Sequence, residues 1–212
     1  SKSNLLSLYN TLEKIPSSEK NIATYKNEKI SMSQKLVYYK KKGNVSNLRL
    51  VIKAPTTMFD KEYLDLVALN NILTGDLNAL LLKVLRNEKG LVYSCYGEHE
   101  IDQVSKQLSF FTINTLCNTK NLLKVINLIV DVFKKIKTSY IDKKYIETYK
   151  SDIDMIKENR IICKKPDYVL ERYSNYMIWD KPIISFNKNY IIKKNITQEI
   201  LLNLSRKLFN KD

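Results

Sequence analysis

Histidine is almost absent from this sequence, because His99 is the only one among 212 residues. Motifs that bind zinc through two histidines, HExxH and HxxEH, therefore cannot be completed. A Ser/His/Asp set that needs a second histidine is excluded for the same reason. His99 stands between Glu98 and Glu100 at the end of a predicted strand, a setting typical of a surface residue rather than a ligand. We therefore expect no metal to be bound by this chain.

Glycine and cysteine are also scarce, with four and three residues. The scattered glycines form neither a GxGxxG motif nor a P-loop, which excludes a glycine-rich phosphate cradle. The cysteines, Cys95, Cys117 and Cys163, lie far apart without a CxxC pair, so no disulfide framework or thiolate zinc site is indicated. We interpret them as reduced thiols of the cytoplasm or another reducing compartment.

Long apolar runs are missing as well. No apolar segment approaches the roughly 20 residues of a transmembrane helix, so we expect no membrane partner. The first residues, SKSNL, lack the apolar core and cleavage site of a signal peptide, and none is expected.

Acidic residues are outnumbered: the sequence has 22 aspartates and glutamates and 36 lysines and arginines, which gives a net charge of +14. The densest clusters contain only lysine, at 40–42, 134–135, 143–144 and 193–194, with no arginine-rich stripe. A solvated lysine surface is our first interpretation. A patch for an acidic partner and a nucleic-acid footprint remain as alternatives, since lysines also release counterions from phosphates.

Periodicity predicts strands and helices in a definite order. Strands are predicted at 35–42, 47–54, 91–98 and 108–116, with Gly43-Asn44 as a hairpin turn between the first two. Helices are predicted at 5–15, 60–73, 77–87, 119–137, 142–160, 166–179 and 197–209, with Asp142 and Thr197 as N-caps. Consecutive antiparallel strands with separate helices predict an α+β fold, an antiparallel β-sheet covered on one side by several α-helices.

One segment, NNILTGDLNALLLKVLRNEKGLVYS at 70–94, carries a recognisable motif. It resembles the signature of the second domain of the pitrilysin/insulinase metallopeptidases, or inverted zincins, which reads roughly ILGGGxxSxLxxxxRExxGLAYSV. The matching residues are Ile72-Leu73, Gly75, Leu81, Arg86, Gly90-Leu91 and Tyr93-Ser94. The departures are Thr74-Gly75-Asp76 in place of GGG, Ala79-Leu80 in place of Ser-Arg, and Asn87 in place of the Glu.

The resemblance implies the C-terminal, non-zinc half of a zinc metalloendopeptidase that binds an extended peptide. It assigns both catalytic and substrate-binding roles to Arg86 and Tyr93. Arg86 would anchor substrate carbonyls with its guanidinium donors, and Tyr93 would donate its phenol hydrogen to the carbonyl oxygen of the cleaved bond. The zinc would be held by a partner domain or subunit, and the isolated chain should be inactive because HxxEH is absent.

The same resemblance predicts the domain organisation. Residues 1–34 would be the end of a preceding domain and a linker, and residues 35–212 the C-terminal domain of the pitrilysin/insulinase type. The expected partners are a peptide substrate and a zinc-bearing N-terminal domain or subunit, in a homodimer or heterodimer. The net charge of +14 would favour acidic peptides.

Two alternatives from other functional classes stay open. A non-catalytic scaffold or assembly subunit of the same family would have the same fold, and the zinc-ligand motif of the partner half would decide between scaffold and enzyme. A basic nucleic-acid-binding protein is ranked last, and it predicts binding that weakens steeply with salt.

Overall fold

The computed structural model describes Asn10 and residues 13–14, 43–54, 56, 60, 62–101, 109–158, 166–178 and 182–209. The chain divides into two units, Ser1–Ser31 and Met32–Asp212. In the first unit only Asn10, which is helical, and the turn at 13–14 are described. The predicted strand at 35–42 and nearly all of the predicted segments at 5–15 and 17–34 lie outside the described residues. The architecture below is that of the second unit.

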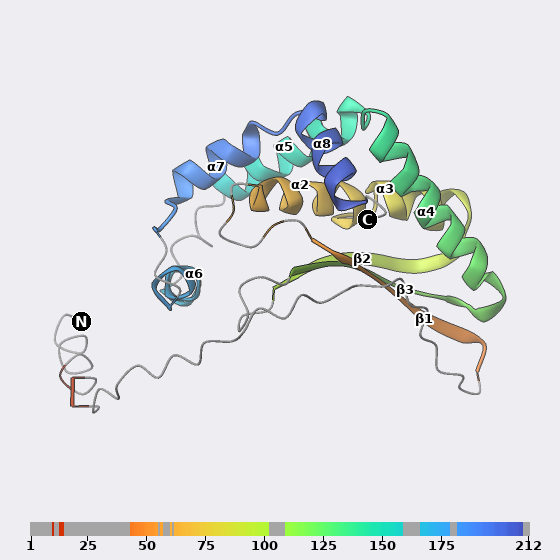
Figure 1. The fold of residues 1–212 in the computed structure, drawn as a ribbon, viewed down its shortest axis with the longest axis horizontal. Coiled ribbons are helices and arrows are strands. Elements are labelled where there is room, and N and C mark those ends of the chain that lie inside the picture. The colour runs from red at the N-terminus through yellow and green to blue at the C-terminus, as the bar shows by residue number, and fades with distance from the viewer. Residues whose placement is uncertain are drawn as a thin grey trace. The chain divides into compact units, whose positions relative to one another are not determined.

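Three antiparallel strands form the described sheet, in the order β1-β3-β2 (Figure 1). Their bounds are Val45–Lys53 for β1, Val92–Ile101 for β2 and Ser109–Asn118 for β3. The central strand pairs Ile113 with Leu50 on one side and with Gly97 on the other. Alternate residues of β1 are exposed, which is the pattern of a strand with one face on a core.

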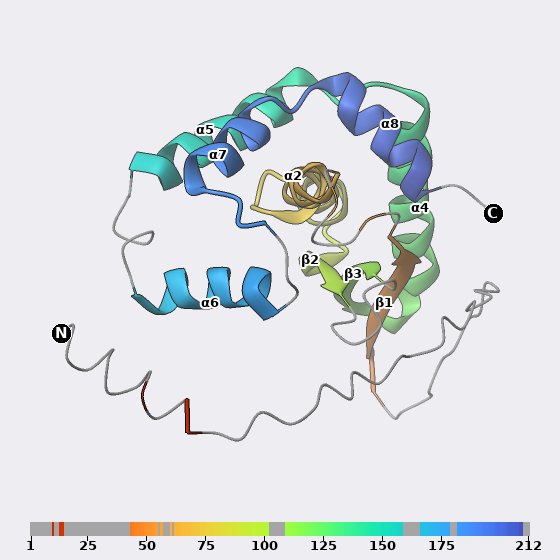
Figure 2. The same ribbon diagram turned by 60° about the vertical axis from the view of Figure 1, so that its left-hand side comes forward.

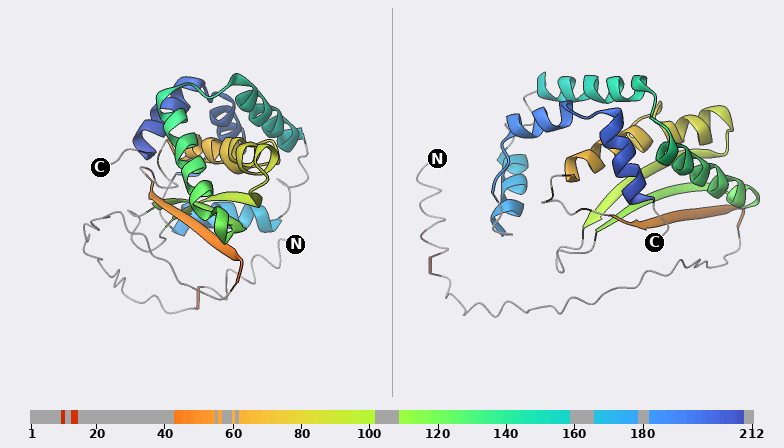
Figure 3. Two further views of the ribbon diagram at one scale, coloured as in Figure 1. Left: turned by 90° about the vertical axis from the view of Figure 1, so that its right-hand side faces the viewer. Right: turned by 45° about the horizontal axis from the view of Figure 1, so that its top comes forward.

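Helices lie over the buried face of this sheet, as Figures 1 and 2 show. The helical elements are α2 (Tyr63–Thr74), α3 (Leu80–Leu82), the π-helix η1 (Lys83–Glu88), the 3₁₀ turn η2 (Thr119–Asn121), α4 (Leu122–Thr138), α5 (Lys143–Glu158), α6 (Pro166–Ile178), α7 (Phe186–Lys194) and α8 (Gln198–Leu208). Of these, α6 lies beside the sheet and not over it (Figure 1). The predicted α+β fold class is thus confirmed. The right-hand view of Figure 3 shows the strands side by side beneath α2, α4 and α8.

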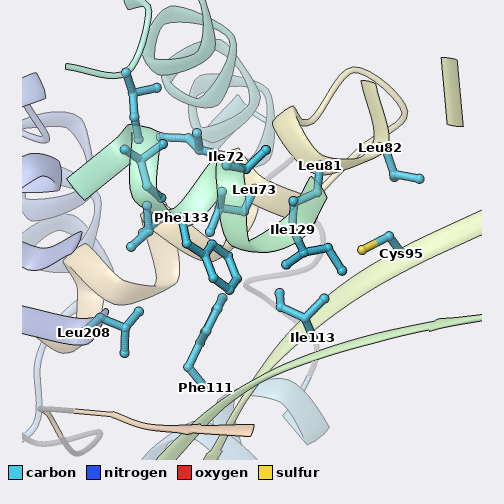
Figure 4. Packing of buried hydrophobic residues seen from close by; sticks show 14 of the residues in the cluster. Ile72, Leu73, Leu81, Leu82, Cys95, Phe111, Ile113, Ile129, Phe133 and Leu208 are labelled. Carbon is cyan, nitrogen blue, oxygen red and sulfur yellow. The ribbon is translucent and has the colours of Figure 1, made fainter. Parts of the chain in front are cut away.

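The core lies between the sheet and these helices (Figure 4). Phe111 and Ile113 point from β3 toward the helices and are fully buried. The Phe209 ring stacks on Phe133 of α4 at 4.2 Å and meets Phe111 edge-on at 6.4 Å between ring centroids. Aromatic contacts of this geometry add to the free energy gained from apolar burial, so they fix the end of α8 to both α4 and the sheet.

Several helix boundaries differ from the predictions. The helix expected from residue 60 begins at Tyr63, and the one expected at 77–87 is divided into α3 and η1. Helix α7 was not predicted at all. Both predicted N-caps are present, since the Asp142 carboxylate accepts from the Lys144 amide at 3.1 Å and the Thr197 hydroxyl accepts from the Ile200 amide at 3.2 Å.

Helix α2 is attached directly to the outer edge of β2 at Gly97. The Gly97 amide donates to the Thr74 hydroxyl, and the Asn70 side-chain amide donates to the Gly97 carbonyl, both at 3.0 Å. An edge strand leaves such backbone groups without ladder partners. Here two side chains of α2 provide those partners, so β2 is held in place along its free edge.

Candidate functional site

Arg86 lies in the π-helical turn that ends the α3–η1 segment. The turn is closed by hydrogen bonds from the Leu91 amide to the Leu85 carbonyl at 2.8 Å and from the Gly90 amide to the Arg86 carbonyl at 2.9 Å. Gly90 has φ of 60°, a left-handed conformation that glycine adopts without steric cost. A π-helical turn adds a residue to the regular helix and is found frequently at functional sites. It determines where the Arg86 side chain leaves the helix.

Tyr93 lies at the start of β2, in a β-bulge. Val92 is opposite Cys117 and Cys95 is opposite Thr115. β2 therefore advances by three residues where β3 advances by two, which leaves one extra residue on β2. The side chains of Val92 and Cys95 both enter the core, whereas Tyr93 is 80% exposed. A bulge re-aims side chains in this way, and bulges are common next to active sites. The bulge therefore keeps the Tyr93 phenol accessible.

The structure brings these two residues together. The Arg86 guanidinium carbon is 5.0 Å from the centroid of the Tyr93 ring, a cation–π arrangement. Arg86 is half-buried and forms no salt bridge to any residue that the structure describes. Its donors are therefore available to a ligand beside the exposed phenol. An accessible hydroxyl and an accessible guanidinium can together bind a carbonyl or carboxylate oxygen.

The loop before Arg86 is anchored by a residue that departs from the family signature. Asn87 donates from its side-chain amide to the Leu77 carbonyl at 3.2 Å. The Asp76 carboxylate accepts from the Asn78 amide at 2.6 Å. The loop between α2 and α3 is thus held by contacts that the family's GGG and Glu would not make.

The predicted surface position of His99 is wrong. Its ring lies 5.3 Å from that of Tyr63 between centroids, and both ring nitrogens are buried. Burial lowers the pKa of this imidazole, and the nearby Thr56 backbone acts in the opposite direction. Within the described ranges, no three histidine, cysteine or acidic side chains lie together as metal ligands. His99 is a packing residue between β2 and α2.

Protonation of His99 should therefore destabilise the fold. Because its folded pKa lies below the unfolded value of about 6.5, the unfolded chain binds the proton more tightly, and the free energy of unfolding falls as pH drops below 6.5. Urea unfolding of wild type and His99→Phe between pH 7.5 and 5.5 tests this. The wild-type midpoint should fall more than that of the variant, and equal slopes would contradict the expectation.

Cys95 and Cys117 are both buried and free. Burial raises the pKa of the Cys95 thiol to about 12 and also raises that of Cys117. Both thiols are therefore protonated at neutral pH, and neither can act as a thiolate nucleophile. Cys163 lies outside the described residues.

The sheet face turned away from the helices, here called the outer face, carries Tyr93 together with residues that the sequence did not single out. It comprises Asn47, Arg49, Val51 and Lys53 of β1, Phe110, Thr112, Asn114 and Leu116 of β3, and Tyr93, Tyr96, Glu98 and Glu100 of β2. Tyr96 is 51% exposed and Leu116 is 49% exposed. Leu116 lies between Cys117 and Thr115, the partners of the residues on either side of the bulge, and Tyr96 follows the bulge directly. The Tyr93 site thus continues along β2.

A cavity of about 380 Å³ lies elsewhere, on the helical side. It is formed by the end of α2, the loop to α3 and the facing residues of α5, including Lys144 and Tyr149. Neither Arg86 nor Tyr93 contributes to it. This cavity is therefore separate from the site described above.

The family described as "Peptidase M16 inactive domain" matches residues 3–153 of the chain. No curated protein matches this chain. The part of the chain that the structure describes has no helix long and apolar enough to cross a membrane.

Solved structures of other proteins share the fold of this chain. The peptidase M16 inactive domain from Pseudomonas fluorescens is 17% identical with a TM-score of 0.69, over 79% of this chain and 39% of that one. A protease from Helicobacter pylori is 17% identical with a TM-score of 0.66, over 81% of this chain and 40% of that one. The inactive peptidase domain of a putative zinc protease from Bordetella parapertussis is 10% identical with a TM-score of 0.62, over 82% and 92%. The chain spans about two fifths of the first two proteins.

Proposed function

We propose that this chain, which belongs to the peptidase M16 inactive-domain family, is the non-zinc half of a zinc metalloendopeptidase. In this role it contributes Arg86 and Tyr93 to a zinc site on another domain or subunit. Its substrate would be a peptide bound in an extended conformation. The observation that carries the proposal is the contact between Arg86 and the exposed phenol of Tyr93.

Each residue of the pair has a distinct role. The guanidinium of Arg86 has five donors in a fixed plane and would bind backbone carbonyls of the peptide. The Tyr93 hydroxyl would donate to the carbonyl oxygen of the cleaved bond as negative charge develops on it. The cation–π contact keeps the positive charge of Arg86 close to the phenol, which favours that developing charge further.

The metal belongs to the partner in this proposal. His99, the only histidine, is packed against Tyr63, and within the described residues no group of three potential ligands lies together. The residues present do not fit a zinc ion, which would activate water when bound in the other half. What this chain does is bind the peptide and place two donors at its reacting carbonyl.

Peptide hydrolysis by the full-length protein, or by this chain joined with its zinc-bearing half, tests the role of Arg86. Arg86→Ala should lower kcat/KM about 30-fold, because a hydrogen bond to a charged group contributes about 2 kcal/mol. The matched control is Arg206→Ala, an exposed arginine of α8, which should leave hydrolysis unchanged.

The result separates the enzyme from the scaffold. Loss of hydrolysis in Arg86→Ala with unchanged zinc content supports the proposed role. An unchanged rate would remove Arg86 from the site. If the wild type hydrolyses no peptide with zinc bound, the scaffold subunit becomes the better assignment.

A further inference from the structure

The bulge at Tyr93 decides which residues of β2 share its face. Without it, Cys95 and Gly97 would alternate onto the side of Tyr93. With it, Cys95 is buried in the core and Tyr96 and Glu98 are exposed on the outer face. Tyr96 is opposite Asn114 and Glu98 is opposite Thr112. The rows of the outer face therefore run from Tyr93 and Leu116, through Tyr96, to Glu98.

Three large side chains near the bulge are accessible, and the register places Tyr96 in a row with Asn114 and Arg49. Tyr93, Tyr96 and Leu116 are 80%, 51% and 49% exposed, and they come from two paired strands. Adjacent exposed side chains of this size on one face are typical of a binding surface. Rows on a strand are about 6.6 Å apart, the same as the spacing of alternate side chains in an extended peptide.

The row beyond, formed by Val51, Thr112 and Glu98, carries a single charge, the carboxylate of Glu98. Arg49 forms a salt bridge with Glu100, and Glu100 also accepts from the Thr112 hydroxyl at 3.2 Å. Glu98 is exposed and has no salt bridge to any residue in the described ranges. The positive charge of Arg49 is thus neutralised by Glu100. Lys53 on β1, in the row of Glu100, also forms no salt bridge to a described residue, so the face as a whole is neutral and Glu98 is its unpaired carboxylate.

We propose that Tyr96, Leu116 and Glu98 form a specificity subsite for the peptide substrate, which takes a large apolar side chain over Tyr96 and a basic side chain at Glu98. This rests on the proposed function, because the distances are counted from Tyr93 at the cleaved bond. At about 3.3 Å per residue, the apolar side chain lies about two residues from that bond and the basic one about four. The Glu98 carboxylate therefore selects a basic side chain at this position, contrary to the acidic peptides that net charge alone suggests.

Paired peptides test the subsite in the zinc-loaded full-length protein. They differ only in lysine, glutamine or glutamate at the fourth residue from the cleaved bond, on either side. Wild type should prefer lysine to glutamate. Glu98→Gln should reduce that ratio of kcat/KM about threefold and Glu98→Lys about tenfold, with the glutamine peptide unchanged, since exposed charge pairs give effects of this size. Glu147→Lys on α5 is the matched control.

A second comparison tests the contact between Tyr96 and an apolar side chain of the peptide. Tyr96→Ala should lower kcat/KM for peptides with leucine or phenylalanine at the second residue about tenfold, relative to peptides with alanine there. Tyr140→Ala, which changes another tyrosine that is more than half exposed, should not.

The outcomes distinguish this inference from the proposed function. An unchanged lysine-to-glutamate ratio in both Glu98 variants, with Arg86→Ala still impaired, overturns the subsite alone. If Arg86→Ala hydrolyses at the wild-type rate, the proposed function fails first. Fluorescent versions of the same peptides, bound to the zinc-depleted full-length protein, give a readout without turnover. Equal affinity of wild type and Glu98→Lys for the lysine peptide would also overturn the subsite.

Discussion

Tyr93→Phe should lower kcat for peptide hydrolysis by about 100-fold to 1,000-fold, with little change in KM. A donor aimed at a developing oxyanion contributes about 3–4 kcal/mol to the transition state, and the substitution removes only the hydroxyl. The ring that contacts Arg86 at 5.0 Å is retained. Because Tyr93 is 80% exposed, the free energy of unfolding should change little.

The measurement compares kcat, KM, zinc content and the unfolding midpoint of wild type and Tyr93→Phe in the full-length protein. Tyr140→Phe is the control, because Tyr140 is 59% exposed and lies outside the sheet. A loss in KM alone would assign Tyr93 to ground-state binding rather than to the transition state. An unchanged kcat with full zinc content would exclude Tyr93 from the reaction.

The location of this pair could be predicted from the sequence, but its local geometry could not. The spacing of Arg86 and Tyr93 around Gly90 indicated that a helix end and a strand start would place them near each other. The π-helical turn and the bulge each add one residue to a regular element. Such insertions leave apolar periodicity almost unchanged, so LLLKVLRNE at 80–88 predicts an ordinary α-helix.

The outer face was missed for the same physical reason. Strict alternation from Tyr93 assigns Cys95 and Gly97 to its face and Tyr96 to the core. A slip of one residue moves every later side chain to the other side, and the bulge introduces such a slip. The only sequence signal was that this assignment would bury Tyr96 and Glu98 and expose Cys95, which contradicts their usual burial.

Helix α7 and the position of His99 depend on tertiary contacts. α7 has no fully buried residue, so no apolar stripe predicts it. Tyr190 and Lys194 attach it to α5 by donating to Asp154, at 2.7 and 2.6 Å. His99 becomes buried because Tyr63 of α2 packs against it. Residues distant along the chain therefore stabilise α7 and bury His99. A single sequence does not show which distant residues will come into contact.

Gly97→Ala should destabilise the fold by about 3 kcal/mol, a factor of about 100 in the unfolding equilibrium. A β-carbon built on Gly97 would lie 2.1 Å from the Asn70 side-chain oxygen and 3.0 Å from the Thr74 hydroxyl. Asn70 would have to move away, because overlap at 2.1 Å is not tolerated. It would lose its hydrogen bonds to the Gly97 carbonyl and the Thr74 hydroxyl. Overpacking of this kind typically costs about 1–3 kcal/mol, and each lost hydrogen bond about 1 kcal/mol.

Urea unfolding measures the effect as a lower midpoint, and Ser94→Ala in the same strand is the control. Ser94 is exposed on β2, so its substitution should stay within about 0.5 kcal/mol of wild type. An equally small effect for Gly97→Ala would show that α2 does not lie close against β2.

A second substitution identifies the cause. If the steric conflict is with Asn70, the double variant Asn70→Ala/Gly97→Ala should be less destabilised than the sum of the single changes, by 0.5 kcal/mol or more, because the residue that must move is already small. Additive effects would instead assign the cost to Thr74 or to the strand itself. Rescue would establish that α2 and β2, the strand bearing Tyr93, can approach this closely because Gly97 has no side chain.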